Sequence, residues 1–229
     1  MNASASGRNR AFTMVELLVV VAIIGVLAAI MVPVARNFIH NGRSAKDVNN
    51  LRAIGAGIML YAQDNNMKLP PMSPSPWTWP FWSFLVAPYC GQPTPNEVID
   101  GVPYTTGVFR CPGGWKPHWI SDYAANNFVF SDQGKQMPLA RIPNPSSTLL
   151  VANEGTPATK QYGWFLNAWT QFALPDPTFS ASQWPAFIWN GETAFHALFA
   201  DGAVRSISKD DFRQNYKTYL GARPLWNGL

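Results

Sequence analysis

The sequence predicts an α+β protein in which a long N-terminal helix packs on a small antiparallel β-sheet domain with long loops. Three observations predict this fold class. An uncharged apolar run lies near the N-terminus, and a helical segment with apolar residues on one face follows it. In the C-terminal part, two short β-type runs flank an Asp-Gly pair, which is a strong signal for a tight hairpin.

The apolar run extends from Leu17 to Ala35 without a charged residue, a stretch of 19 residues. About 20 apolar residues cross the hydrocarbon core of a bilayer. A secretory signal has a shorter apolar core and a small-residue cleavage site after it, whereas here Pro33 and Arg36 occupy that place. We therefore expect a transmembrane segment over residues 14–35 that is retained as an anchor.

The charges around this run give an ambiguous orientation. Basic residues stand on both sides of the run: Arg8 and Arg10 before it, and Arg36, Arg43, Lys46 and Arg52 after it. A plain positive-inside count places the C-terminal side in the cytoplasm. The N-terminal motif and the two cysteines discussed below favour the opposite orientation, which is the one we adopt.

Glu16 is an acid near the start of the apolar run. A carboxylate at that depth costs roughly 2.5–3.5 kcal/mol on insertion scales, so a positive charge from another copy of the chain is its most economical partner. A position in the first helical turn also suits an acid. The alternative is an acid that stays among the lipid headgroups.

The helix is expected to continue to about residue 66. Four apolar residues recur at helical spacing and predict a face that packs on a globular domain: Leu51, Ile54, Ile58 and Tyr61. Pro33 lies inside the helix and is expected to bend it.

Residues 67–229 are long enough for one domain with its own core. The proline-rich stretch over residues 70–80 predicts an ordered loop. Strand-like runs cover residues 148–152, 197–200 and 203–207, and the last two flank Asp201 and Gly202. They predict an antiparallel hairpin.

Cys90 and Cys111 are the only cysteines. Outside the cytoplasm they can pair, closing a loop of about 20 residues and adding about 3 kcal/mol. This disulfide is the favoured interpretation. The alternatives are two free buried thiols and a metal site that includes His118, although the spacing fits no common zinc pattern.

Other candidate sites are weaker. His196 and Asp201 lie five residues apart, which puts them on opposite faces of a regular strand, so a structural histidine is favoured over a shared site. Calcium is a weak possibility at three acids: Asp201, Asp210 and Asp211. No cofactor is expected. The sequence contains no nucleophile elbow, His-Glu-x-x-His motif or phosphate loop, which argues against an enzyme.

The ten tryptophans all lie beyond residue 67. Aromatic packing is the favoured interpretation, and a surface platform for sugars or single-stranded nucleic acid is the alternative. The formal net charge of +4 is too small to indicate a nucleic-acid partner.

The segment Phe12–Val20, FTMVELLVV, resembles the N-terminus of type IV pilins and of type II secretion pseudopilins. The resemblance implies a leader over residues 1–11, cleavage between Ala11 and Phe12, N-methylation of Phe12, and a role for Glu16 in subunit registration. The family prefers glycine before the cleaved bond, and this chain has alanine. A looser resemblance, carried by Cys111-Pro112, residues 121–126, and His196 before residues 199–202, points to a branch of pilin-like proteins abundant in planctomycetes.

The family resemblance implies a structural subunit that polymerises into a type II secretion pseudopilus or a type IV pilus. The implied partners are further copies, other pilins and pseudopilins, a prepilin peptidase, an inner-membrane platform with its ATPase, and the bilayer. The implied location is the inner membrane, with a periplasmic domain, and then the filament. The main alternative is a membrane-anchored, tryptophan-rich protein that binds glycan, and a third reading, a membrane-bound hydrolase, lacks a nucleophile–base pair.

Overall fold

The computed structural model describes residues 14–72, 81–92, 97–99, 102–113, 121–126, 129–130, 136–153 and 193–219. The chain divides into two compact units, Met1–Gly42 and Arg43–Leu229.

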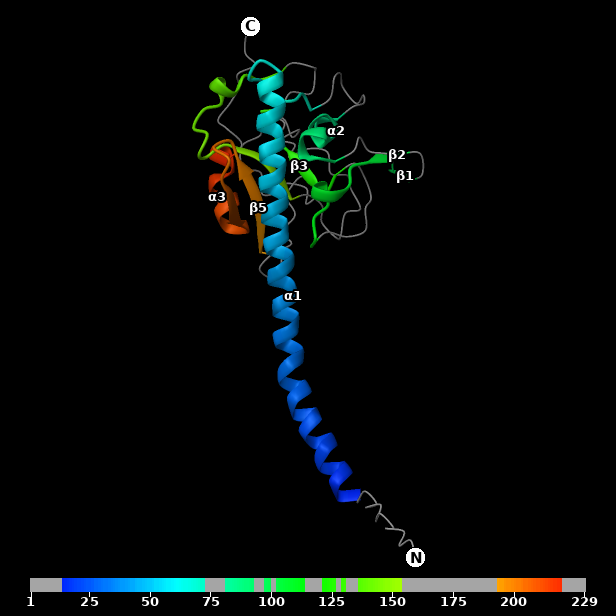
Figure 1. Ribbon diagram of the computed structural model, residues 1–229. Helices are drawn as coiled ribbons and strands as arrows, with labels where there is room; N and C mark the ends of the chain where they lie inside the picture. Colours follow the sequence, from blue (N-terminus) through cyan, green and yellow to red (C-terminus); the bar gives the residue numbers. More distant parts are fainter. Residues whose placement is uncertain are drawn as a thin grey trace, which may run out of the picture. The chain divides into compact units, whose positions relative to one another are not determined.

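Helix α1 runs from Met14 to Asp64 and confirms the predicted long N-terminal helix (Figure 1). In the first unit every described residue of α1 is exposed, including large apolar side chains such as Leu18 and Ile24. Among the described residues, α1 is the one helix long and apolar enough to cross a membrane.

Pro33 lies inside α1, which continues through it. Because proline has no N–H, the carbonyl of Ala29 loses its usual helical partner at this point. The blue, N-terminal part of the ribbon curves in Figure 1, which is the behaviour expected of a helix with an internal proline.

The end of α1 also agrees with the sequence. Asn66 and Met67 have left-handed backbone conformations, with φ of 56° and 57°, so the helix does not continue beyond Asp64. Inside the second unit, Leu51, Ile54 and Ile58 are fully buried, as their helical spacing predicted.

The second unit contains a four-stranded antiparallel sheet in the order β3-β4-β5-β6. Its strands are β3 (Tyr123–Ala125), β4 (Leu149–Asn153), β5 (Ala194–Phe199) and β6 (Val204–Ser208). The predicted α+β fold is confirmed, and so is the hairpin at Asp201 and Gly202, where Gly202 takes a φ of 83° in the turn between β5 and β6. A separate pair, β1 (Glu97–Ile99) and β2 (Val102–Tyr104), is also antiparallel.

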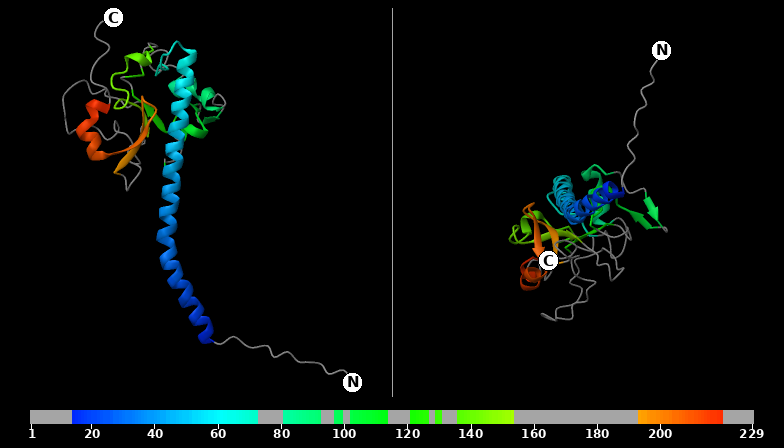
Figure 2. Two further views of the ribbon diagram at one scale, coloured as in Figure 1. Left: turned by 60° about the vertical axis from the view of Figure 1, so that its left-hand side comes forward. Right: turned by 90° about the horizontal axis from the view of Figure 1, so that it is seen from below.

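Alternation along the strands gives this sheet two buried faces. Tyr123, Val151 and Leu198 belong to one apolar cluster with the buried residues of α1. Phe195 and Phe199 belong to a second cluster with Phe212 of helix α3 (Lys209–Tyr219). The sheet therefore lies between α1 and α3, as Figure 2 shows.

Short helical segments complete the described part of the second unit. They are α2 (Trp82–Val86), η1 (Ala87–Cys90), η2 (Gly107–Phe109) and η3 (Leu139–Arg141). Trp82 is buried and meets Phe109 and Phe130 edge-on, with ring centroids 5.9 and 5.8 Å away. For this tryptophan the packing interpretation is confirmed, and the other nine lie outside the described residues.

Candidate functional site

Three polar side chains form a row across the face of the sheet that meets α1. Tyr123 of β3 is directly opposite Asn153 of β4, and Ala152 is opposite Ala197, which puts Asn153 beside His196 of β5. The backbone N–H of His196 donates to Oδ1 of Asn153 over 2.8 Å. Neighbouring strands therefore present a phenol, an amide and an imidazole at one level of the sheet.

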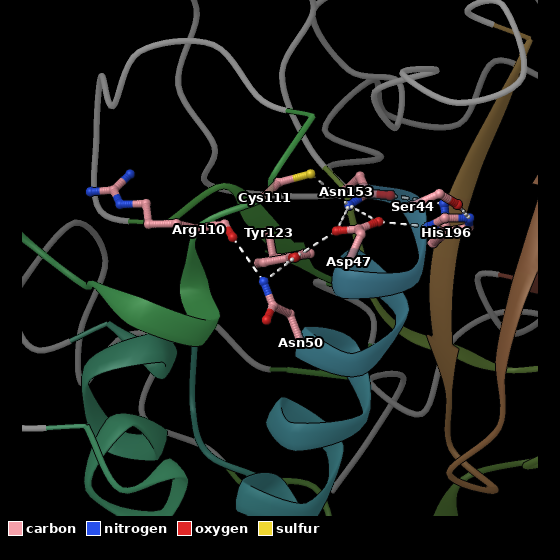
Figure 3. Close-up of polar contacts among 8 residues, drawn as sticks. All are labelled: Ser44, Asp47, Asn50, Arg110, Cys111, Tyr123, Asn153 and His196. Atoms are coloured by element: carbon pink, nitrogen blue, oxygen red, sulfur yellow. Dashed lines mark hydrogen bonds and ion pairs between the residues drawn. The ribbon is translucent and has the colours of Figure 1, made fainter. Parts of the chain in front are cut away.

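Asp47 of α1 lies against this row and is fully buried (Figure 3). Its Oδ1 accepts from the Tyr123 hydroxyl at 2.6 Å and from Asn153 Nδ2 at 2.9 Å. Its Oδ2 lies 2.6 Å from His196 Nδ1 and 3.0 Å from Asn153 Nδ2. Each of the three strands thus places a polar group on one carboxylate, and we call Asp47, Tyr123, Asn153 and His196 the Asp47 cluster.

The direction of these hydrogen bonds is fixed by the backbone. A backbone N–H can only donate, so the side chain of Asn153 must turn its oxygen toward His196 and its NH₂ toward Asp47. Burial and the Asp47 carboxylate raise the pKa of Tyr123 above its usual range, so the phenol stays protonated and donates. Both oxygens of Asp47 therefore act as hydrogen-bond acceptors.

Further groups surround the cluster. Asn50, also buried, donates to the Arg110 carbonyl at 2.9 Å and to the Tyr123 hydroxyl at 3.3 Å. The Arg110 guanidinium pairs with Asp122 at 3.0 Å, and the Asp122 carboxylate also accepts from the backbone N–H of Cys111. Burial raises the pKa of Asp122, and the nearby Arg110 charge opposes that rise.

A serine hydrolase triad consists of a serine, a histidine and an aspartate, and the same residue types meet here in Ser44, His196 and Asp47. Ser44 Oγ lies 3.4 Å from His196 Nε2. Such a nucleophile needs hydrogen-bond donors for the oxyanion that forms on attack. Ser44 lies deep inside α1, where the backbone N–H groups are already bonded to carbonyls one turn earlier. We therefore interpret the three residues as a structural contact.

The weak calcium candidates Asp201, Asp210 and Asp211 are not brought together with this cluster. Asp201 accepts from the Ala203 N–H at 2.9 Å and from Arg205 Nη2 at 3.0 Å within the β5–β6 turn. Asp210 and Asp211 lie in the first turn of α3, where Asp211 accepts from the Tyr219 hydroxyl at 2.7 Å. The described residues contain no group of three acidic, histidine or cysteine side chains that could hold a metal ion.

The structure has Cys90 and Cys111 as free thiols, so the expected disulfide is not formed in it. The two sulfur atoms have different neighbours, which explains the difference. Cys90 Sγ contacts the Ala53 carbonyl of α1 at 3.6 Å, whereas Cys111 Sγ accepts from Asn153 Nδ2 at 3.6 Å. Burial raises the pKa of the Cys90 thiol to about 11, and deeper burial together with the nearby Asp47 carboxylate raises the pKa of Cys111 further. The proposed third ligand of a metal site, His118, lies outside the described residues.

Sequence reasoning favoured a structural role for His196 and found no partner for it, because its partner lies 149 residues earlier in the chain. A signal for Asp47 was present. Asp47 falls four residues before Leu51 and seven before Ile54, on the same face of the helix. An acid on an apolar face indicates a buried, paired carboxylate.

The N-terminal motif lies only partly within the described residues. Glu16 lies in the first turn of α1, where the positive end of the helix dipole favours an acid. Residues 1–13, with Ala11 and Phe12, lie outside the description.

Comparison with known proteins finds similarity in this N-terminal segment. Residues 6–32 match the family model of the prokaryotic N-terminal methylation motif. The chain is 47% identical over 47 residues to the type IV major pilin protein PilA of Myxococcus xanthus, a match that covers 20% of this chain and 21% of the relative. No solved structure matches the chain. By this motif and this similarity, the N-terminal segment of the chain resembles that of type IV pilins.

Proposed function

We propose that the chain is a structural subunit that is cleaved between Ala11 and Phe12, N-methylated at Phe12, and polymerised into a pilus or a type II secretion pseudopilus. Before assembly the subunit is held in the inner membrane by residues 14–35, with its second unit in the periplasm. A prepilin peptidase processes it, and an inner-membrane platform with an ATPase extends the polymer. The filament is a head-to-tail assembly of further copies and related pilins.

The exposed apolar surface of α1 is the observation that carries this proposal. Leu17, Ile24 and Val32 are each at least half exposed, and the other large apolar residues before Gly42 are exposed as well. An apolar surface of this length needs lipid or other helices around it. A membrane supplies the first environment, and a bundle of α1 helices in a filament supplies the second.

Glu16 supplies the specificity of the assembly. Packing between apolar helices is weakly directional, whereas a carboxylate in an apolar surrounding must be matched by a cation. Cleavage after Ala11 creates a new amino group on Phe12, four residues before Glu16. In a polymer, the amino group of one subunit neutralises the Glu16 carboxylate of its neighbour and so sets the axial register.

Two substitutions of Glu16 test the assembly step. Glu16→Gln removes the charge at nearly constant size, and Glu16→Asp keeps the charge. We expect Glu16→Gln to accumulate in the membrane without filaments and Glu16→Asp to retain a substantial part of assembly, measured by shearing and electron microscopy. Asp64→Asn, at an exposed position of the same helix, is the matched control and should assemble normally.

Mass spectrometry of the same preparations tests the processing step. Filament protein should begin at Phe12 and carry one added methyl group. Recovery of filaments built from Glu16→Gln, or of mature filaments that retain residues 1–11, contradicts the proposal. Normal membrane anchoring with no filament in any variant supports a tethered protein such as a glycan-binding one.

A further inference from the structure

We propose that Arg36, Arg43 and Lys46 of α1 form a binding surface for the headgroups of anionic phospholipids. We call these three residues the basic stripe. The inference rests on the proposed membrane anchoring by residues 14–35 and adds a lipid preference to it. It does not depend on cleavage after Ala11 or on polymerisation.

The charges along α1 are almost all positive. Between residues 17 and 63 the helix contains one acid, Asp47, and four cations: Arg36, Arg43, Lys46 and Arg52. Asp47 is fully buried and accepts hydrogen bonds inside the Asp47 cluster. The three residues of the basic stripe are exposed, and none of them forms an ion pair within the part of the chain that the structure describes. The stripe therefore presents positive charge to its surroundings.

The basic stripe begins where the apolar run ends. Arg36 directly follows Ala35, the last residue of that run, and Arg43 lies seven residues later, or about 10 Å along the helix. The headgroup layer on one side of a bilayer is about 5–8 Å thick. The Cα–Cβ bonds of a helix tilt toward its N-terminus, which here is the direction of the apolar run. The long side chains of Arg43 and Lys46 can therefore extend back to the headgroups while their charged ends stay in a polar layer.

Two apolar side chains among these cations indicate an interfacial position for this part of α1. Phe38 is 73% exposed and Ile39 is 57% exposed, although both lie beyond Arg36. Water is an unfavourable surrounding for them. The boundary between acyl chains and headgroups accommodates apolar side chains next to cations. The basic stripe and these two residues therefore suit the same layer of the bilayer.

Anionic lipid is the occupant that the position of the basic stripe favours. A bilayer around residues 14–35 already brings headgroups to Arg36, whereas an acidic protein would first have to be recruited. The phosphate of phosphatidylcholine is neutralised by the ammonium group of the same headgroup, and that of phosphatidylglycerol is not. Lys and Arg side chains near a bilayer surface are therefore attracted by the second lipid.

This surface also accounts for the ambiguous charges around the apolar run. A plain count of cations places the C-terminal side of the run in the cytoplasm, because Arg36, Arg43 and Lys46 follow it. The proposed function has the same residues in the periplasm. Binding to anionic headgroups supplies a reason for cations on that side of the membrane.

The lipid preference is measured with the full chain reconstituted in phosphatidylcholine bilayers. Electron paramagnetic resonance of spin-labelled phosphatidylglycerol, and of spin-labelled phosphatidylcholine, gives the fraction of each lipid that contacts the protein. The two fractions yield the association constant of the anionic lipid relative to the neutral one. Arg8 and Arg10 also attract anionic headgroups, from the other side of the apolar run. The deciding quantity is therefore the change that a substitution causes in this relative constant.

Removing the three charges together should lower the relative association constant of phosphatidylglycerol. The variant carries Arg36→Gln, Arg43→Gln and Lys46→Gln, and we expect a fall of about fivefold or more, since one cation near an anionic surface contributes about a factor of five. A variant with Arg36→Lys and Arg43→Lys keeps the charges and should keep the wild-type constant. High salt should lower the wild-type constant, because it screens exposed charges.

Arg52→Gln is the matched control, because it removes one cation from the same helix. Arg52 lies nine residues, or two and a half turns, after Arg43, so it is on the opposite face of α1 and further from the apolar run. Its removal should leave the lipid preference unchanged. An unchanged preference in the triple variant, or an equal fall in Arg52→Gln, overturns the proposal. A wild type that contacts neither lipid contradicts the membrane anchor as well, whereas lipid contact that the triple substitution does not alter contradicts the basic stripe alone.

Discussion

The part of α1 before Gly42 exposes its large apolar side chains, whereas the part after Gly42 buries them. Ile24 is 59% exposed and Ile54 is fully buried, although both are isoleucines in the same helix. The first part has no sheet to cover it within its own unit, and the second part packs on β3, β4 and β5. One continuous helix therefore carries two kinds of surface, one suited to lipid or neighbouring helices and one suited to a protein core.

The difference also concerns polar residues. Both parts contain an acid in an apolar context, but Asp47 meets its partners inside its own unit. Under the proposed function, Glu16 meets its cation on another subunit. A buried carboxylate can therefore stabilise a fold or direct an assembly, depending on which chain supplies its partner.

Asp47→Ala should give the largest effect on the second unit. The substitution leaves Tyr123, Asn153 and His196 as buried polar groups without their common acceptor, which typically costs about 3–5 kcal/mol of the free energy of unfolding. Urea unfolding in mild detergent, followed by tryptophan fluorescence, measures this loss. Asp64→Ala is the control and should cost less than about 1 kcal/mol, because Asp64 is exposed and accepts one bond from Tyr89. Equal losses in the two variants would contradict the assigned role of the cluster.

Much of this fold could be predicted because its signals are local. The spacing of Leu51, Ile54 and Ile58 identified the buried face of α1, and the Asp-Gly pair identified the hairpin. The Asp47 cluster could not be predicted in the same way, because its members come from four elements spread over some 150 positions. Which side chains meet there depends on the pairing of β3, β4 and β5, and the sequence does not state that pairing.

The cysteines illustrate the same limit of local sequence signals, because here the sequence suggested a contact that the structure does not make. Their spacing is compatible with a disulfide, but a bond requires both sulfur atoms to point at each other. Cys90 instead points at α1 and Cys111 at Asn153. Local spacing therefore allowed a pairing that the three-dimensional arrangement does not make.

A pair of identical substitutions sharpens the comparison between the two parts of α1. Ile54→Ala should lower the free energy of unfolding of the second unit by about 2–5 kcal/mol, because it removes buried methyl groups and leaves a cavity. Ile24→Ala should leave that free energy unchanged, since Ile24 belongs to the other unit and is exposed. The same urea titration measures both. A comparable loss for Ile24→Ala would mean that the first part of α1 also contributes to the core of the second unit.

A glycine pair gives the smallest effects, and these have opposite signs. A Cβ on Gly57 would clash with Cys90 Sγ and lie 3.1 Å from Val86 Cγ1, so both of these side chains would have to move. Gly57→Ala should therefore cost about 1–3 kcal/mol, as overpacked cores do. A Cβ on Gly42 meets nothing within 4 Å, so Gly42→Ala gains only helix propensity, up to about 1 kcal/mol. Helix content by circular dichroism and urea unfolding measure the two variants. Stabilisation by Gly57→Ala would show that α1 does not approach Cys90 this closely. The second part of the helix would then be less tightly packed than the burial of Ile54 indicates, and the contrast between the two parts would be weaker.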